Sequence, residues 1–196
     1  MSESCCEPGL MPPQSVHLDE GVRLLYDLSK DQLVDIIVDS AKNWLAHDGL
    51  WFQAIENSHG MAAAMDADRE AWRKFTVIEA QRIMARLGIK PGGGIPALIE
   101  CLKHRHYARL NLQQVQDVSD TRVVFTMVDC RVQSARKRKG LPDFPCKSVG
   151  IVEYEEFART VDARIETRCI ACPPDPHPEY FWCAWEFTLR QPSPAE

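Results

Sequence analysis

The stretch LNLQQVQDVSDTRVVFTMVDC, residues 110–130, marks the point at which the hydrophobic pattern of the chain changes. Before it, apolar residues recur at the three- and four-residue spacing of amphipathic helices. Within it, apolar residues alternate between two faces, and Val123, Phe125 and Met127 share one of them. This period of two predicts a pair of strands that turn near residues 119–120.

Helices are predicted over most of residues 17–108. Ser29 and Gln32 have the spacing of a capping box, which indicates the start of a helix. A second, short helix is expected to end near Gly60. The clearest helical pattern covers residues 66–88, where apolar residues share one face. A fourth helix is expected after the glycine-rich break KPGGG.

The chain beyond the first pair of strands predicts one or two helices and a second hairpin. Residues 146–162 have helical spacing, and residues 164–170 and 180–189 read as strands on either side of a proline-rich loop. This order of elements indicates an α+β fold, in which N-terminal helices pack on a four-stranded antiparallel sheet made of two hairpins separated by helix.

Three segments follow from these patterns. Residues 1–16 carry several prolines and few core-type residues, which predicts a flexible tail. Residues 17–108 are expected to form a helical segment, and residues 109–196 a cysteine-rich α+β segment that binds a ligand. A chain of 196 residues has room for one substantial core, so the two segments are expected to form one compact domain.

Charge and composition disfavour some classes of partner. The formal net charge is −5, so the molecule as a whole has no electrostatic attraction to nucleic acid or to an anionic membrane. No apolar run approaches the roughly 20 residues that span a bilayer. The N-terminal sequence MSESCCEPGLMPPQ lacks the basic and apolar regions of a signal peptide. We therefore expect a cytoplasmic protein, with a small molecule as its partner.

The chain contains eight cysteines, and five of them fall between residues 130 and 183. Disulfides are rare in a reducing cytoplasm, so metal binding or thiol chemistry explains this cluster better. Cys5 and Cys6 are expected to be exposed thiols of the tail, and Cys101 is expected to pack in the core. Packing as small hydrophobic residues remains the alternative for the five clustered cysteines.

Strand alternation orients the C-terminal thiols. Cys183 shares a face with Trp185 and Phe187, so it is expected to point toward the core. Cys169 is expected to point inward from the preceding strand, and Cys172 follows it at the start of the proline loop. Because a hairpin places the ends of its strands side by side, Cys169 or Cys172 can meet Cys183. The C-x-x-C spacing also lets two sulfurs reach one ion.

The first functional hypothesis is a thiolate-bound metal beside a small-ligand pocket. The expected metal ligands are Cys130, Cys146, Cys169, Cys172 and Cys183. The first two flank the basic segment 131–139, so they complete a site if the two hairpins pack together; His177 is a substitute ligand. Thiolates suit both zinc and an iron–sulfur cluster, and the sequence does not separate these cofactors.

Two other hypotheses remain open. In the second, Cys172 is the nucleophile of a hydrolase that acts on a small cyclic C–N or C–S substrate, with His177 and Asp175 as acid–base groups. In the third, the chain is a non-catalytic sensor of a small ligand, and its helical half docks on a partner. The amphipathic helices also allow a homodimer.

Several short motifs carry a family resemblance. They are the DC of residues 129–130, the FPC of residues 144–146, and the RCIACPPD and WCAWEF of residues 168–175 and 182–187. Over about residues 110–190 the chain resembles the aminothiazoline-carboxylate hydrolase-like family and, more distantly, the 4-vinyl reductase-type ligand-binding domains. The helical half is similar to an uncharacterised bacterial group that joins helices to this domain.

The resemblance implies an α+β fold with a small-ligand pocket between helices and sheet, and with cysteines near its mouth. For the hydrolase-like relatives, the implied chemistry is ring opening of a cyclic thio-amidine. The positions that the resemblance carries over are Cys130, Cys146, Cys172 and Cys183, with Cys169 as an extra.

Overall fold

The computed structural model of the chain describes residues 18–190. The predicted tail over residues 1–16, with Cys5 and Cys6, lies outside the described residues. The elements are α1 (Leu18–Tyr26), α2 (Lys30–Leu87), α3 (Gly94–Lys103), the 3-10 helix η1 (His106–Arg109), β1 (Leu112–Gln116), β2 (Arg122–Asp129), α4 (Arg131–Arg138), α5 (Lys147–Val161), β3 (Ile165–Ala171) and β4 (Cys183–Leu189). No helix within residues 18–190 is both long and apolar enough to cross a membrane.

The chain separates into two compact units, one up to Asp39 and one from Ser40 onward. The first unit contains α1 and the beginning of α2. There the backbone N–H of Gln32 donates to Ser29 Oγ over 3.2 Å, and the N–H of Ser29 donates to Gln32 Oε1 over 2.9 Å. These bonds satisfy donors at the start of the helix, which confirms the predicted capping box.

Helix α2 is one element where the sequence pattern predicts three helices. It runs from Lys30 to Leu87, and its one residue with non-helical dihedral angles is Gly60, with φ 85° and ψ 166°. A positive φ of this size favours glycine, because other residues clash with their own backbone there. The helical dihedral angles thus break at Gly60, where a helix end is predicted, and a second helical stretch follows directly after this kink.

The sheet lies in the second unit and has four strands in the order β1-β2-β4-β3. Every neighbouring pair is antiparallel. The hairpins β1–β2 and β3–β4 meet through the β2–β4 pair, and α4 and α5 lie between them in the chain. The predicted α+β fold with a four-stranded antiparallel sheet is confirmed.

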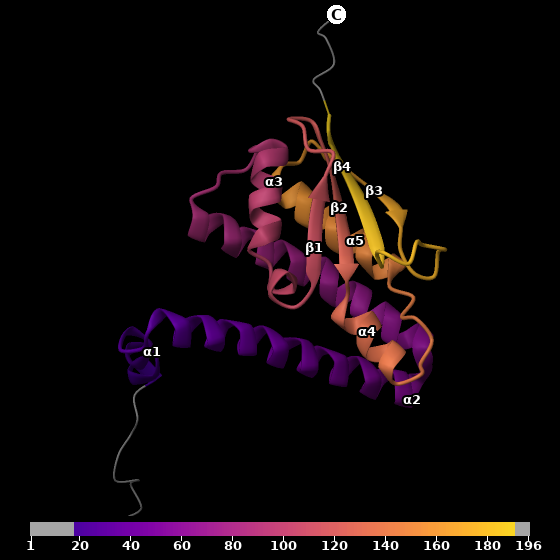
Figure 1. Cartoon of the computed structure of the whole chain (residues 1–196), viewed down its shortest axis with the longest axis horizontal. Coiled ribbons are helices and arrows are strands. Elements are labelled where there is room, and N and C mark those ends of the chain that lie inside the picture. Colours follow the sequence, from indigo (N-terminus) through magenta and orange to yellow (C-terminus); the bar gives the residue numbers. More distant parts are fainter. Residues whose placement is uncertain (1–17, 191–196) are drawn as a thin grey trace, which may run out of the picture. The chain divides into compact units, whose positions relative to one another are not determined.

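Helices α3 and α5 cover one face of the sheet (Figure 1). Phe125, Trp185 and Phe187 point into this interface and are almost fully buried, as is Phe157 of α5. Gly150 of α5 lies against the Trp185 ring, and a Cβ atom at this position would come within 2.8 Å of Trp185 Cζ2. The missing side chain of Gly150 therefore lets the indole ring pack directly on α5.

A β-bulge places the second thiol of the C-x-x-C motif. Cys169 lies opposite Trp185 and Ala171 lies opposite Ala184, so β3 has one extra residue at this point. After the bulge, Ala171 and Cys172 are both buried, with 7% and 1% of their surface exposed. The bulge thus ends the simple alternation of β3 and puts Cys172 inside the protein.

Candidate functional site

A pocket of about 690 Å³ opens within the second unit, which begins at Ser40. Its wall is formed by parts of α2 beyond Ser40, the segment around η1, the end of β2, α4, α5 and the start of β4. The side chains of Phe52, Trp72 and Phe144 contribute aromatic surface. Concave sites of roughly 300–1,000 Å³ with such linings commonly bind small organic molecules.

Four cysteines, here called the thiol cluster, gather at this pocket: Cys130, Cys146, Cys172 and Cys183. Cys130, Cys146 and Cys183 line the pocket. The Sγ atom of Cys172 lies 3.5 Å from that of Cys146, and the Cys172 thiol also contacts Cys183. All four are free thiols, and residues from both hairpins and both connecting helices bring them together.

Each thiol of the cluster stands at the end of an element. Cys130 is the N-cap residue of α4, and Cys146 is the N-cap residue of α5. Cys172 directly follows β3, and Cys183 is the first residue of β4, where it pairs with Met127 of β2. The partial positive charge at a helix N-terminus favours the thiolate forms of Cys130 and Cys146.

Hydrogen-bond donors point at three of the four sulfurs. The indole N–H of Trp185 donates to Cys183 Sγ over 3.3 Å, and the side-chain amide of Gln133 donates to Cys146 Sγ over 3.6 Å. The backbone N–H groups of Val132 and Gln133 donate to Cys130. Donors of this kind stabilise negative charge on sulfur.

Gln133 also fixes the loop that carries Cys146. Its side chain is 1% exposed, donates to the carbonyl of Phe144 over 2.8 Å and accepts from the Phe144 N–H over 2.9 Å. The amide group is therefore fully used, and it ties α4 to the residues just before α5. This tie holds the Cys146 sulfur at the edge of the pocket.

The pKa values of the clustered thiols diverge. The hydrogen bond from the Cys172 thiol lowers the pKa of Cys146, against the opposing effect of burial. The contacts with Cys146 and Cys183 raise the pKa of Cys172 far above its ordinary value. Burial raises the pKa of Cys130 to about 12. Of these three thiols, Cys146 therefore ionises most readily.

Three carboxyl groups that line the same pocket are here called the carboxyl cluster: Asp48 and Asp68 of α2, and Glu153 of α5. Burial raises the pKa of Asp68 to about 7, and the charges of Asp48 and Glu153 add to this effect. Burial likewise raises the pKa of Glu153 to about 7, although Arg105 opposes it. Burial also raises the pKa of Asp48. The lining thus concentrates acidic groups away from water.

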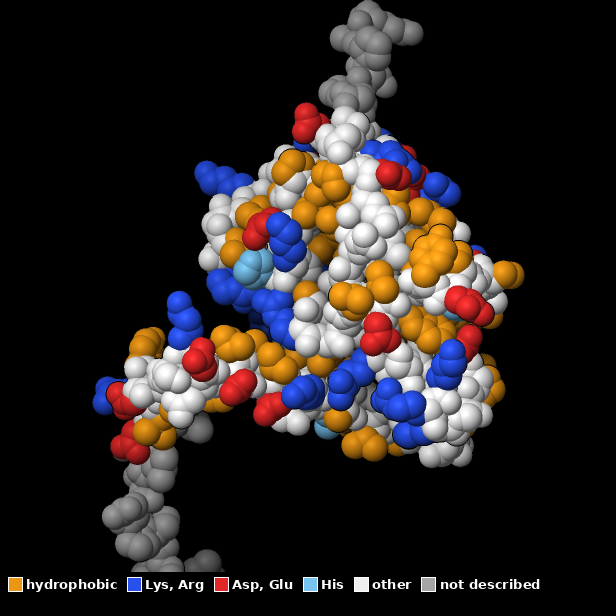
Figure 2. Space-filling model, in the orientation of Figure 1, with side chains coloured by type: hydrophobic (Ala, Val, Ile, Leu, Met, Phe, Trp, Pro, Cys, Tyr) orange, Lys and Arg blue, Asp and Glu red, His pale blue; other side chains and the backbone are white. Residues whose placement is uncertain are grey.

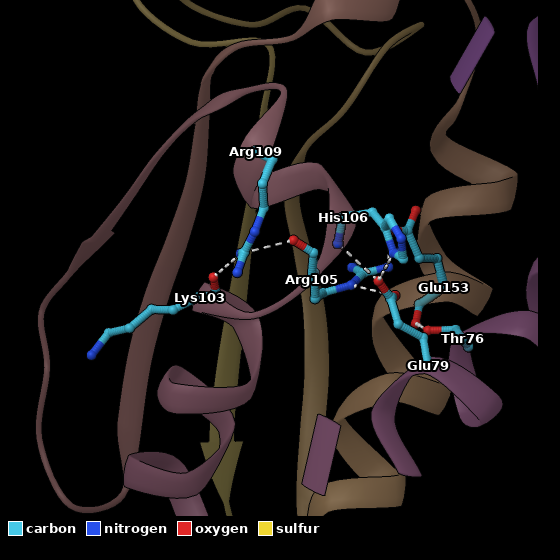
Figure 3. Close-up of polar contacts among 7 residues, drawn as sticks. All are labelled: Thr76, Glu79, Lys103, Arg105, His106, Arg109 and Glu153. Atoms are coloured by element: carbon cyan, nitrogen blue, oxygen red, sulfur yellow. Dashed lines mark hydrogen bonds and ion pairs between the residues drawn. The ribbon is translucent and has the colours of Figure 1, made fainter. Parts of the chain in front are cut away.

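Arg105 lies behind Glu153 and is 2% exposed (Figure 3). Its Nε lies 2.8 Å from Glu79 Oε2, and its Nη2 lies 2.8 Å from Glu153 Oε1. The guanidinium carbon also lies 4.6 Å from the centre of the Phe157 ring. Burial alone would raise the pKa of Glu79, but the Arg105 charge and hydrogen bonds from His106 outweigh it and lower the pKa to about 2.

Basic side chains of α4 and its C-terminal cap form another part of the pocket wall, and Figure 2 shows Lys and Arg side chains gathered over α4. Arg131, Arg136 and Lys139 line the pocket. Arg136 donates from Nε to the carbonyl of Pro142 over 2.8 Å, and its guanidinium lies 6.0 Å from the centre of the Phe144 ring. The basic segment noted in the sequence therefore borders the pocket.

Residues 26–189 match a protein family described as "Family of unknown function (DUF6125)". The chain belongs to this family. No curated protein and no solved structure matches the chain. The matched region contains α2, the whole sheet and every residue that lines the pocket, so the site described above lies inside the region that this DUF6125 chain shares with its family.

The other predicted site residues of this DUF6125 chain lie on the second hairpin. Cys169 is half-buried in β3 and its pKa is raised to about 11, mainly by burial. The His177 ring packs 5.3 Å from the Trp182 ring, and its Nδ1 lies 3.0 Å from the carbonyl of Pro178. The Asp175 carboxylate pairs with Lys147 over 2.7 Å. Within residues 18–190, no contact joins His177 to a cysteine sulfur.

The carboxyl cluster and the buried arginine were not predicted from the sequence. One signal was present for Glu153: it occupies the apolar face of α5, four residues after Val149 and four before Phe157, where a charged residue is unusual. Arg105 follows α3 in a short connection, where nothing in the sequence separates it from an exposed arginine. Its role depends on contacts with Glu79, 26 positions away.

Across residues 18–190, no three or more His, Cys, Asp or Glu side chains are already arranged to hold a metal ion. Of the thiol cluster, Cys146 and Cys172 are in direct contact and Cys172 also touches Cys183. An ion bound by three of these sulfurs would therefore require at least one thiol side chain to turn toward the others.

Proposed function

We propose that the chain binds a thiophilic metal ion through the thiol cluster, beside a pocket that takes a small molecule. The observation that carries this proposal is the 3.5 Å distance between the Sγ atoms of Cys146 and Cys172, with Cys183 in contact with Cys172. The proposed fourth ligand is Cys130, which lines the same pocket as Cys146 and Cys183. Thiolates select zinc or iron–sulfur clusters among biological metals.

The sulfur–sulfur distance suits a single ion. Two thiolates on one tetrahedral zinc lie about 3.8 Å apart, since each Zn–S bond is about 2.3 Å long. The Cys146–Cys172 distance of 3.5 Å is close to this value. In a cubane cluster each cysteine binds a different iron, which requires a wider spacing of sulfurs. Zinc is therefore favoured over a cubane cluster, and a 2Fe–2S cluster, which holds two cysteines on each iron, is the alternative.

The surroundings of the sulfurs support the same proposal. Thiolate ligands of metals commonly accept hydrogen bonds from an outer layer of residues that orient them and balance their charge. Trp185 and Gln133 provide such donors to Cys183 and Cys146, at 3.3 and 3.6 Å. Cys130 and Cys146 stand at helix N-termini, which also favours the deprotonated form that a metal requires.

Metal analysis of anaerobically purified protein tests the proposal. We expect about one equivalent of zinc per chain, without visible colour, and less than about a tenth of it in Cys172→Ser. Cys101→Ser is the matched control, because Cys101 is also a buried free thiol but lies outside the cluster. Iron with acid-labile sulfide would favour the cluster. A metal-free wild type, or equal metal in Cys172→Ser, would contradict the proposal.

A second candidate function is thiol catalysis on a small cyclic C–N or C–S substrate, and the lowered pKa of Cys146 favours it. Cys146 lines the pocket, whereas the pKa of Cys172 is raised by its thiol contacts. The nucleophile in this case is Cys146. Labelling with iodoacetamide at neutral pH tests it: Cys146 should react at least tenfold faster than the other cysteines. Uniformly slow labelling would exclude this candidate.

A further inference from the structure

We propose that the carboxyl cluster, together with the rings of Trp72 and Tyr107, binds the ammonium group of a small organic amine. This inference rests on the pocket of the proposed function and names the class of molecule that fills it. It does not depend on the metal, because Asp48, Asp68 and Glu153 are separate from the thiol cluster.

The first argument is the grouping of acidic side chains in one part of the pocket lining. Asp48, Asp68 and Glu153 line one pocket; the charges of Asp48 and Glu153 raise the pKa of Asp68, and the charge of Asp48 raises that of Glu153. The buried cation beside them, Arg105, is shared between Glu153 and Glu79, and the neighbouring His47 lowers the pKa of Asp48 against the larger effect of burial. Buried like charges repel each other, and a bound cation removes this repulsion. A ligand that carries positive charge therefore complements this part of the lining.

The second argument is the aromatic wall beside these carboxyls. Trp72 is 5% exposed, and its ring stacks on that of Tyr107 with centroids 5.5 Å apart. The Trp72 side chain donates a hydrogen bond to Asp68, which joins the ring to the carboxyl group. Such rings attract cations: the Arg105 guanidinium carbon already lies 5.8 Å from the centre of the Trp72 ring and 5.9 Å from that of Tyr107, and desolvation strengthens the attraction. Acid and aromatic groups together are typical of sites for organic cations.

The basic residues of α4 give the opposite expectation for their own part of the wall. Arg131 and Lys139 line the pocket, and a ligand that bound there would carry negative charge. We favour the amine because Glu153 is buried and Asp48 and Asp68 are half-buried, where charge is more costly, while Arg131 and Lys139 are exposed to solvent.

Three probes that share a benzene ring distinguish these ligand classes. Phenethylamine carries a positive charge at pH 7.5, 2-phenylethanol is neutral and 3-phenylpropionate is an anion. Calorimetric titration into the full-length chain should show binding of the amine at least tenfold tighter than of the other two. Equal or tighter binding of the alcohol or the carboxylate would overturn the proposal, and the carboxylate result would assign the pocket to an anion held by α4.

Two variants and one control locate the binding. Asp68→Asn and Glu153→Gln keep the shape of the side chain and remove its charge, so each should weaken amine binding at least tenfold. Asp66→Asn is the matched control, because Asp66 lies two positions from Asp68 on the same helix, pairs with Arg69 and does not line the pocket. Unchanged affinity in both pocket variants, or an equal loss in the control, would overturn the proposal.

Metal content measured on the same samples separates this inference from the proposed function. A metal-free protein that prefers the amine would refute the metal site and leave the ligand class standing. A metal-loaded protein without preference for the amine would refute the ligand class alone. Asp68→Asn should retain the metal content of the wild type, because the residue is not part of the thiol cluster.

Discussion

Cys146 and Cys172 hold their Sγ atoms 3.5 Å apart, although 26 positions separate them in the chain. The backbone holds the two segments together as well, since the N–H of Lys147 donates to the carbonyl of Pro173 over 2.9 Å. Each cysteine adjoins one partner of this bond. The contact between the sulfurs is therefore set by the junction of α5 and the proline loop, and not by two mobile side chains alone.

This contact predicts a specific disulfide in protein stripped of metal. Diamide should oxidise the two thiols, which lose two electrons and two protons as the S–S bond forms and the azo group is reduced. Peptide mapping should find Cys146 joined to Cys172, because a small rotation brings 3.5 Å to the bond length of about 2.05 Å. Zinc added beforehand should prevent the reaction.

Other products would count against the thiol cluster as described. A dominant bond between Cys172 and Cys183 would mean that the contact with Cys183 is the closer one in solution. Oxidation of Cys101 at the same rate would mean that the buried core opens during the reaction, because Cys101 is fully buried.

The second prediction concerns Arg105. Arg105→Met should destabilise the protein by about 3–5 kcal/mol, because it leaves the buried carboxylate of Glu79 without its positive partner. Arg69→Met removes an exposed partner of Asp66 and should cost less than about 1 kcal/mol. Urea unfolding of both variants measures the difference. Equal free energies of unfolding for Arg105→Met and Arg69→Met would show that Arg105 is solvated and not part of a buried ion pair.

Local patterns of the sequence predicted the sheet, because alternation in β2 and β4 reports directly which side chains face the core. Val123, Phe125 and Cys183 are buried as that alternation requires. The position of Cys172 could not be derived this way, since it depends on a bulge that adds one residue to β3. A bulge shifts the alternation by one residue, and only two residues of β3 follow Cys169, too few to reveal the shift.

Only part of the site could be predicted from the sequence. Clustering and strand ends pointed to Cys130, Cys146, Cys172 and Cys183, and the fold brings these together. The carboxyl cluster joins residues of α2 to α5 over long sequence distances, and local spacing carries no information about such contacts. His177 illustrates the reverse case: proximity in sequence suggested a base for Cys172, and its ring packs on Trp182.

The third prediction concerns the packing of α5 on the sheet. Gly150→Ala should destabilise the protein by about 1–3 kcal/mol, because the new Cβ would lie 2.8 Å from Trp185 Cζ2 and displace the ring. The nearest atom to a Cβ at Gly49 lies at 4.0 Å, so Gly49→Ala should stabilise its helix by about 0.5–1 kcal/mol. Thermal unfolding should show a lower melting temperature for Gly150→Ala and a higher one for Gly49→Ala. A higher melting temperature for Gly150→Ala would mean that α5 shifts freely away from Trp185.

The fourth prediction is a dependence of stability on pH that Asp68 causes. Its pKa in the folded protein is raised to about 7 from the ordinary 3.8, so the folded state holds a proton that the unfolded state has released between these values. The free energy of unfolding therefore falls as pH rises from about 4 to about 7 and is level above that. Asp68→Asn removes this effect. The variant should match the wild type near pH 4 and exceed its stability at pH 8 by up to about 4 kcal/mol.

Urea unfolding at pH 4, 6 and 8 measures this difference, and Asp66→Asn should show none of it. Glu79 acts in the opposite sense, because its pKa is lowered to about 2 from 4.5 and its contribution is lost only as pH falls below about 4.5. Both the wild type and Asp68→Asn retain Glu79, so its effect cancels in the comparison. A difference between these two proteins that stays constant from pH 4 to pH 8 would show that Asp68 is ionised and solvated in the folded state.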